Sequence, residues 1–183
     1  MSNVVRCKWV NLNNPKYIEY HDKEWGIPSF SDAYLFEMLI LESFQAGLSL
    51  ECILNKRESF RLSFDNFDYQ LIANYNGEKI NELMNNKDII RNKLKIKAAI
   101  NNAKVFINIQ KEYGSFSNYI WHFTNGSIIK NQDDNFKASS KLSDEVSADL
   151  KKRGMKFVGS TIIYSYLQAI GVINDHELNC ALY

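Results

Sequence analysis

The sequence is poor in the features that mark secreted, membrane or disordered proteins. Its 183 residues include three cysteines, two prolines and eight glycines. Three cysteines without a framework spacing argue against a disulfide scaffold and favour a reducing compartment. The N-terminus lacks the apolar segment of a secretion signal, and no run approaches the roughly 18 apolar residues that a membrane helix needs. We therefore expect a soluble, cytoplasmic protein without a membrane partner.

An excess of charge of one sign is also missing, since the formal net charge is +1. The chain therefore has no global basic field, and any attraction for DNA must come from a local cluster. Hydrophobic residues make up 45% of the chain and aromatic residues 13%, which is enough for a proper core. The length fits one large domain or two small lobes. We expect a single domain over residues 1–183 and, because nothing indicates an oligomer, a monomer.

The spacing of apolar residues is almost wholly helical, and no pair of alternating runs is joined by a hairpin signal. This predicts an all-α fold of seven or eight helices without an internal repeat. Polar residues over Asn125–Leu142 indicate a surface loop. The predicted helices run from Ser31 or Asp32 to a stop at Gly47, from Ser49 to about Leu62, Tyr69 to Tyr75, Glu78 to Asn85, Ile89 to Lys111, Ser115 to Trp121, Ser143 to Arg153 and Ser160 to about Ile170.

Cysteine and histidine, although scarce, are concentrated near the two ends of the chain. Cys7 and His21 lie in the N-terminal segment, and His176 and Cys180 lie in the C-terminal one. Two cysteines and two histidines are the ligand set of a closed, structural zinc site, which would clip the termini together. Spacing alone leaves open that the four residues are unrelated. If they do bind zinc, we expect the neighbouring Asp175 to orient His176 rather than to act as a catalytic acid.

Glu42 interrupts an apolar helical stripe at a position where the pattern requires a core residue. Burying a carboxylate without a partner is costly. One interpretation is structural: Glu42 caps a neighbouring helix or pairs with a buried cation. The other is functional: a pocket carboxylate that meets a ligand with hydrogen-bond donors or positive charge. The pattern does not distinguish the two.

The N-terminal segment is dense in aromatic residues, namely Trp9, Tyr17, Tyr20 and Trp25. Tyr17 and Tyr20 would share one face of a helix. Large flat side chains with polar tips suit stacking on a nucleobase. Ordinary core packing is the alternative, and for any one of these aromatic residues taken by itself it is the better explanation.

A second candidate stretch, DLKKRGMKFVGSTIIYSYLQAIG, combines basic residues with the expected start of a helix. Backbone amides at a helix N-terminus bind phosphate readily, and nearby lysines would add non-specific attraction for a DNA backbone. A solvated basic helix end is the alternative, since it suits the helix dipole. The candidate DNA-contacting residues are Lys151, Lys152, Arg153, Lys156, Gly159, Ser160 and Thr161.

Together these segments resemble the DNA-3-methyladenine glycosylase I family, a branch of the helix-hairpin-helix glycosylases. The segments that carry the resemblance span nearly the whole chain: RCKWV, YIEYHDKEWG, LFEMLILESFQAGLS, LKKRGMKFVGSTIIYSYLQAIG and NDH-x3-C. The resemblance implies a DNA repair enzyme that flips out 3-methyladenine from double-stranded alkylated DNA, hydrolyses its glycosidic bond without strand cleavage and releases the free base. It also implies a DNA-gripping hairpin at GMKFVGST.

The resemblance further assigns roles to residues. It implies a structural zinc bound by Cys7, His21, His176 and Cys180. It implies a base pocket in which Glu42 is the catalytic carboxylate and Trp9, Tyr17 and Tyr20 contact the base.

One departure from the family pattern concerns the pocket itself. The motif AGLSW reads AGLSL here, so Leu50 replaces a tryptophan that would line the pocket. Loss of a stacking aromatic costs roughly 1–3 kcal/mol. Alternative functions are therefore a non-catalytic binder of DNA lesions or an enzyme with altered base specificity. A zinc-dependent hydrolase is a further alternative, but four protein ligands would leave zinc no open position.

Overall fold

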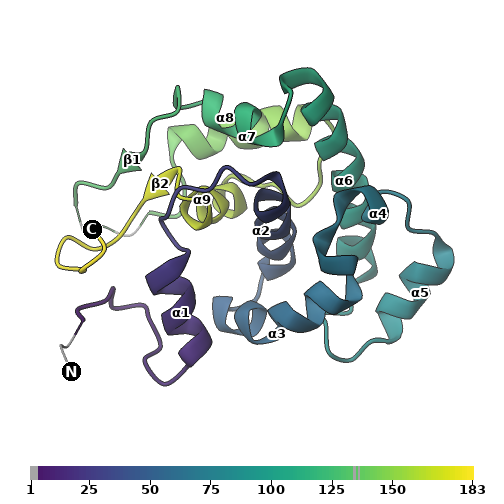
Figure 1. Cartoon of the computed structure of the whole chain (residues 1–183), viewed down its shortest axis with the longest axis horizontal. Coiled ribbons are helices and arrows are strands. Elements are labelled where there is room, and N and C mark those ends of the chain that lie inside the picture. The colour runs from purple at the N-terminus through teal and green to yellow at the C-terminus, as the bar shows by residue number, and fades with distance from the viewer. Residues whose placement is uncertain (1–3, 134, 136) are drawn as a thin grey trace.

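The computed structural model describes residues 4–133, 135 and 137–183. The described part of the chain is helical, as predicted, with one very small sheet. Figure 1 shows the helices arranged around α2. The elements are α1 (Pro15–Lys23), α2 (Asp32–Gln45), α3 (Leu50–Ser63), the 3-10 turn η1 (Asp65–Phe67), α4 (Tyr69–Ile72), α5 (Gly77–Asn85), α6 (Lys93–Tyr113), α7 (Phe116–His122), β1 (Ile129–Lys130), α8 (Lys141–Lys152), α9 (Ser160–Ala169) and β2 (Ile173–Asn174).

The central helix α2 is buried along most of its length. Every residue from Leu35 to Phe44 is buried, and α3, α6, α7 and α9 all pack against the helix. A helix that is apolar on nearly all sides can be stable only when other elements enclose it. Glu42 is therefore carried into the interior by its own helix.

The ends of α2 and α3 follow from local side-chain chemistry. The Ser31 hydroxyl accepts a hydrogen bond from the Tyr34 amide, and the Ser49 hydroxyl accepts one from the Cys52 amide. Gly47 ends the first helix with φ +80°, a conformation that other residues rarely adopt. The predicted boundaries of these two helices are confirmed.

Three helical predictions need correction. Helix α6 begins at Lys93 rather than at about Ile89, because Asn92 is its N-cap and accepts hydrogen bonds from the Leu94 and Lys95 amides. Helix α8 begins at Lys141 rather than at Ser143, because Ser140 is the N-cap and Ser143 closes a capping box with it. Helix α1 was not among the predicted helices, although Tyr17 and Tyr20 fit one. Asn14 caps it, and Pro15 starts it at a position where proline is favourable.

The strands β1 and β2 pair in parallel, with Ile129 opposite Ile173. This pairing departs from the all-α expectation; β1 lies within the predicted surface loop, whereas β2 follows α9. Each strand has two residues, so neither shows the alternation by which a strand is recognised in a sequence. The pairing ties the chain after α7 to the segment that leads to His176.

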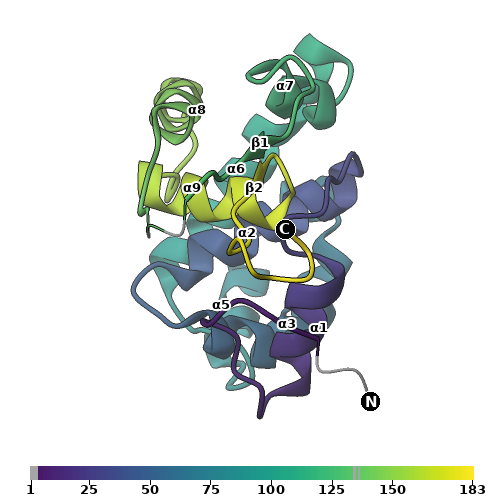
Figure 2. The same cartoon turned by 90° about the vertical axis from the view of Figure 1, so that its left-hand side faces the viewer.

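The two terminal segments lie side by side. The Ala181 amide donates a hydrogen bond to the Val5 carbonyl at 2.9 Å. Figures 1 and 2 both show the C-terminal segment close to α1. None of the described helices combines the length and the apolarity required to cross a bilayer.

Candidate active site

A cavity of about 300 Å³ opens between the N-terminal aromatic segment, α2, α9 and the segment after β2. The loop after β1 closes part of its rim. Thr161, Tyr164 and Gln168 reach it together because their spacing places them on one face of α9. Its described lining includes Trp9, Tyr20, Trp25, Glu42, Gln45, Leu50, Thr161, Tyr164, Gln168, Asp175 and Glu177.

Glu42 lies in the wall of this cavity and is only 5% exposed. Burial raises the pKa of its carboxyl group from 4.5 to about 8. Within residues 4–133, 135 and 137–183, no group hydrogen-bonds this carboxyl, so the structural interpretation of a cap or an ion pair finds no partner. A perturbed acid in a cleft is characteristic of a functional site.

The raised pKa predicts a pH-dependent effect of Glu42→Gln on stability. The neutral carboxyl stabilises the fold below about pH 4.5, and this contribution is lost as the pH rises through about 8. Relative to the unmodified protein, the Glu42→Gln variant should gain about 5 °C in melting temperature between about pH 6 and pH 9. Thermal unfolding followed by circular dichroism measures the difference. A difference that is constant over this range would contradict the raised pKa.

Only some of the aromatic residues predicted to contact a base line the cavity. Trp9 and Tyr20 line the cavity, whereas Tyr17 packs against Trp9 at 5.6 Å between ring centroids and is not among the lining residues. Trp25, which was not assigned to the pocket, lines it and meets Trp9 edge-to-face at 4.8 Å. Burial and the nearby Glu42 raise the pKa of Tyr20 well above its ordinary value, so its phenol stays neutral.

Leu50 is half-buried and lies in the cavity wall at the first residue of α3. The N-cap bond of Ser49 sets where that helix begins and so places Leu50. Phe44 does not replace the missing ring, because it is fully buried and packs edge-to-face against Phe60 in the core. It is not among the residues that line the cavity.

Several polar residues of the wall were not predicted. Gln45, Asp175 and Glu177 each have one buried oxygen without a hydrogen-bond partner in the described structure. These unpaired acceptors favour a ligand that carries hydrogen-bond donors or positive charge. The regular spacing of Tyr164 and Gln168 on α9 was a usable signal, but the approach of Asp175 and Glu177 depends on how the C-terminal segment folds back.

The expectation that Asp175 orients His176 is wrong. Asp175 accepts hydrogen bonds from the Tyr164 hydroxyl at 2.9 Å and from the Gln168 amide at 2.5 Å. The Asn174 side-chain oxygen instead lies 2.8 Å from His176 Nδ1. Adjacent residues in an extended segment point in different directions, so Asp175 faces the cavity while His176 points away from it.

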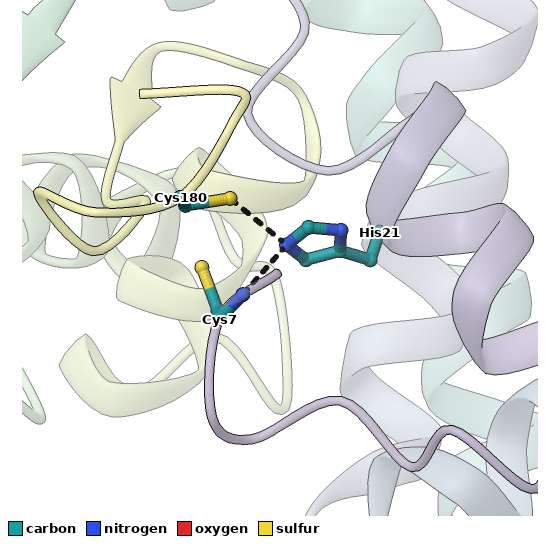
Figure 3. A group of neighbouring side chains, drawn as sticks. All are labelled: Cys7, His21 and Cys180. Atoms are coloured by element: carbon teal, nitrogen blue, oxygen red, sulfur yellow. Dashed lines mark hydrogen bonds between the residues drawn. The ribbon is translucent and has the colours of Figure 1, made fainter. Parts of the chain in front are cut away.

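Cys7, His21 and Cys180 form a buried group that could bind a metal ion. Their ligand atoms lie within 4.8 Å of one another. Figure 3 shows the three side chains converging from the N-terminal segment, α1 and the C-terminal segment. The Cys180 sulfur lies 3.6 Å from His21 Nε2. Tetrahedral zinc with ordinary Zn–S and Zn–N bonds holds a sulfur and a nitrogen about 3.6 Å apart, so this pair has the separation of two zinc ligands.

The imidazoles of His21 and His176 are oriented through their Nδ1 atoms. His21 Nδ1 lies 2.8 Å from Asp22, which Arg6 in turn binds. His176 Nδ1 pairs with Asn174, and its Nε2 is buried without a partner among the described residues. The two rings meet edge-to-face at 5.1 Å. His176 Nε2 is thus left available, as in a metal-binding histidine, whereas His21 Nε2 faces the Cys7 amide at 3.4 Å and the Cys180 sulfur at 3.6 Å. His176 stands beside the three-residue group without being part of it.

The predicted DNA-contacting stretch forms the end of α8, a tight connection and the start of α9. Asn102, on α6, anchors the connection because its amide side chain bonds both the carbonyl and the amide of Lys156. Gly159 is the N-cap of α9 and Ser160 its first residue, and Thr161 lines the cavity. The connection therefore lies next to the candidate base site.

The basic residues of this stretch differ in whether they are exposed or ion-paired within the protein. Lys151, Lys152 and Lys156 are exposed. Arg153 is engaged within the protein, since its guanidinium binds Glu112 and Asp149 at 2.6 Å each. The three lysines are thus the cations of this stretch that remain on the surface.

Comparison with known proteins identifies the family. The profile of the methyladenine glycosylase family matches residues 9–183. The chain belongs to this family. Among methyladenine glycosylases, the chain is 41% identical to DNA-3-methyladenine glycosylase 1 of Escherichia coli (strain K12), over 97% of this chain and 96% of the relative. It is 40% identical to DNA-3-methyladenine glycosylase of Haemophilus influenzae, over 96% of each chain.

Solved structures of methyladenine glycosylases share the fold. A crystal structure of 3-methyladenine DNA glycosylase I superposes with a TM-score of 0.93 at 42% identity, covering 97% of this chain and 98% of that one. A variant of 3-methyladenine DNA glycosylase I in complex with 3-methyladenine gives a TM-score of 0.92 at 32% identity, covering 97% of this chain and 96% of that one.

Proposed function

We propose that residues 1–183 form one glycosylase domain that excises 3-methyladenine from double-stranded alkylated DNA, acting as a monomer and releasing the free base. One observation carries this proposal beyond family membership. Glu42 is a buried acid without a hydrogen-bond partner in the described chain, and it faces an aromatic-walled cavity. Such a site suits a flat base that carries positive charge.

Glu42 recognises the charge of the damaged base. A purine methylated at N3 is cationic while it is attached to the sugar, and a cation beside a carboxyl group lowers the pKa of that group. Binding therefore favours the ionised form of Glu42, although burial alone raises its pKa to about 8. Neutral adenine supplies no such compensation and leaves the buried acid poorly paired, so it is disfavoured.

Recognition of the damaged base also requires that its nucleotide leave the duplex and that the base stack on aromatic side chains. Trp9, Tyr20 and Trp25 provide ring surfaces in the cavity for a nucleotide flipped out of the duplex. The positive charge of the methylated base already weakens its glycosidic bond, so the leaving group requires little acid assistance. The enzyme's task is then to bind the flipped nucleotide and to admit water.

The reaction is proposed to leave the DNA strand intact. Strand cleavage by a glycosylase requires an amine nucleophile at the sugar. Lys137 lies at the cavity rim, but it is exposed, and its ammonium group binds Asn131 at 2.9 Å. Its ammonium group is exposed to solvent and already hydrogen-bonded, unlike the desolvated amine of a lysine nucleophile.

The site also supports a structural zinc ion. We propose that it is bound by Cys7, His21, His176 and Cys180. The ligand atoms of Cys7, His21 and Cys180 lie close together. The buried Nε2 atom of His176 has no hydrogen-bond partner among the described residues. When bound, zinc supplies a cross-link between the chain termini. Four protein ligands leave it no open position for catalysis.

Replacement of Leu50 by tryptophan tests the departure from the family pattern. Since Leu50 lies in the cavity wall, Leu50→Trp should add a stacking surface and tighten binding of free 3-methyladenine by roughly 1–3 kcal/mol, or about five-fold to a hundred-fold. Isothermal titration calorimetry measures the affinity. Leu62→Trp is the matched control because Leu62 is highly exposed and outside the cavity. Unchanged or weaker binding by Leu50→Trp would show that Leu50 is not a deficient stacking position.

The exposed lysines after α8 should contribute to DNA affinity through phosphate contacts. Replacing Lys151 and Lys152 by glutamine should weaken binding to any duplex and reduce the salt slope by about two units, one for each lost contact. Fluorescence anisotropy at several salt concentrations measures both. The control is the same double change at Lys16 and Lys23 on α1. An unchanged slope in the Lys151/Lys152 variant would remove these residues from the DNA interface.

Release of bases from alkylated DNA tests the proposed function directly. The purified protein is incubated with methylated duplex, released bases are separated by chromatography, and strand integrity is followed on a denaturing gel. The expected result is free 3-methyladenine with the strand left intact. DNA binding without base release would support the non-catalytic alternative, and release of other bases would support altered specificity. Direct strand cleavage would require Lys137 or another amine to be reconsidered.

A further inference from the structure

The candidate metal ligands and the base cavity are neighbours along the chain as well as in space. Tyr20 immediately precedes His21, and Asp175 and Glu177 flank His176 on either side. All three of these neighbours line the cavity. The residues that would hold the metal and the residues that would hold the base thus alternate in the same two short segments.

Ring contacts join the two sites through the cavity wall. The Trp25 ring packs edge-to-face against the His176 ring, with 4.6 Å between the ring centroids, and lies nearly parallel to the His21 ring, with 6.2 Å between the centroids. Trp9 meets His21 edge-to-face at 5.3 Å. Each tryptophan therefore has the cavity on one side and a candidate metal-ligating imidazole on the other.

Gly26 shows how closely this layer is packed. A Cβ atom at this position would lie 2.7 Å from the His176 ring, and the backbone there has φ +74°. The His176 ring thus occupies space that is open only because residue 26 is a glycine. The ring therefore has no space to move toward residue 26.

Glu177 provides a third connection. Its amide donates to the Cys7 sulfur at 3.4 Å, and its carboxylate accepts from the Lys8 amide at 2.9 Å. The other carboxylate oxygen is buried without a partner among the described residues, and Glu177 lines the cavity. The position of this acceptor depends on the same N-terminal segment that carries Cys7.

From these contacts we propose that the metal site forms the back wall of the base pocket, so that metal occupancy sets the positions of Trp9, Trp25 and Glu177 and thereby the affinity for a methylated purine. His21 and His176 are then positioning residues for base recognition, in addition to joining the termini. This inference rests on the proposed function. It differs from a purely stabilising role because it predicts an effect on base binding in a protein that remains folded.

The test compares base affinity in zinc-loaded and zinc-free protein. Zinc is removed with a chelator at a temperature at which circular dichroism shows native helix content, and free 3-methyladenine is titrated by calorimetry and by tryptophan fluorescence. The expected result is at least ten-fold weaker binding and a shifted tryptophan emission maximum, both restored when zinc is added back. Equal affinity in folded zinc-free and zinc-loaded protein would overturn the inference.

A distant destabilised variant separates this coupling from general loss of stability. Leu83 is buried in α5, which packs on α6 and contributes nothing to the cavity lining. Leu83→Ala should lower the melting temperature while zinc-loaded protein keeps its base affinity within about two-fold. Similar weakening by Leu83→Ala and by zinc removal would assign both effects to stability and overturn the inference.

Cobalt spectroscopy covers the case in which the zinc-free protein unfolds. Cobalt-loaded protein is titrated with 3-methyladenine, and a change in the visible absorption of the metal is expected because the base presses on the tryptophans behind the ligands. Saturation with base without any spectral change would overturn the coupling. A loaded protein that binds no 3-methyladenine at all would instead overturn the proposed function, and the inference with it.

Discussion

The Cys180→Ser protein is expected to lose the proposed zinc ion and to unfold at a much lower temperature. Cys180 is buried beside His21 and Cys7, and removal of one ligand from a closed site forfeits binding energy that is also folding energy. A loss of roughly 3–5 kcal/mol corresponds to about 10 °C or more in melting temperature for a chain of this length. Metal content by mass spectrometry and thermal unfolding measure the two effects.

Cys52 offers a matched control for this substitution. It is the third cysteine of the chain, is only partly buried and is not part of the metal-binding group. Cys52→Ser should keep full metal content and shift the melting temperature by a few degrees at most. If Cys180→Ser behaved in the same way as Cys52→Ser, the proposed zinc clip between the termini would be wrong.

Glu42→Gln is expected to reduce excision of 3-methyladenine by about thirty-fold to several thousand-fold. The substitution keeps the size of the side chain but removes the negative charge that the cationic base requires. Loss of one partner of a buried charged pair costs roughly 2–5 kcal/mol. Single-turnover release of the base from alkylated DNA measures the effect on the chemical step, and calorimetry with the free base measures the effect on binding.

Two further measurements make the Glu42 result specific. Glu78→Gln, at the exposed first turn of α5, should leave both excision and binding unchanged. The Glu42→Gln variant should also remain folded, since the substitution removes a buried acid that destabilises the protein at high pH. Full excision by folded Glu42→Gln protein would remove Glu42 from catalysis.

Much of the helical architecture was predictable because helix ends depend on local chemistry. Ser31, Ser49 and Ser115 each accept a hydrogen bond from a first-turn amide, and each predicted helix start at these residues is close to the observed one. The two-residue strands could not be predicted in the same way, since β1 and β2 are stabilised by pairing with a segment distant in the sequence.

In the candidate site, too, some residues could be predicted from local sequence and others could not. Glu42 could be singled out because a carboxylate interrupted an apolar pattern, and Trp9 and Tyr20 because aromatic residues were dense around them. Asp175 was misinterpreted because adjacency to His176 indicated a contact, whereas the backbone turns its side chain toward Tyr164 and Gln168. Trp25 belongs to the same aromatic-dense segment, but the family resemblance assigned it no contact with the base. Glu177 was missed because nothing in its local sequence distinguishes a pocket wall from a surface residue.

The sequence by itself determined the helix-rich architecture, the family resemblance, the buried position of Glu42 and the pairing of cysteine with histidine at both ends. These properties depend on residue identity, periodicity and spacing, which are local. Only the tertiary structure decided which side chains share the cavity, that Tyr17 lies outside its lining and that Trp9 and Trp25 lie between the cavity and the candidate metal ligands. The physical reason is that these relations arise when the two chain ends fold against α2 and α9, and contacts across such distances leave no periodic trace in the sequence.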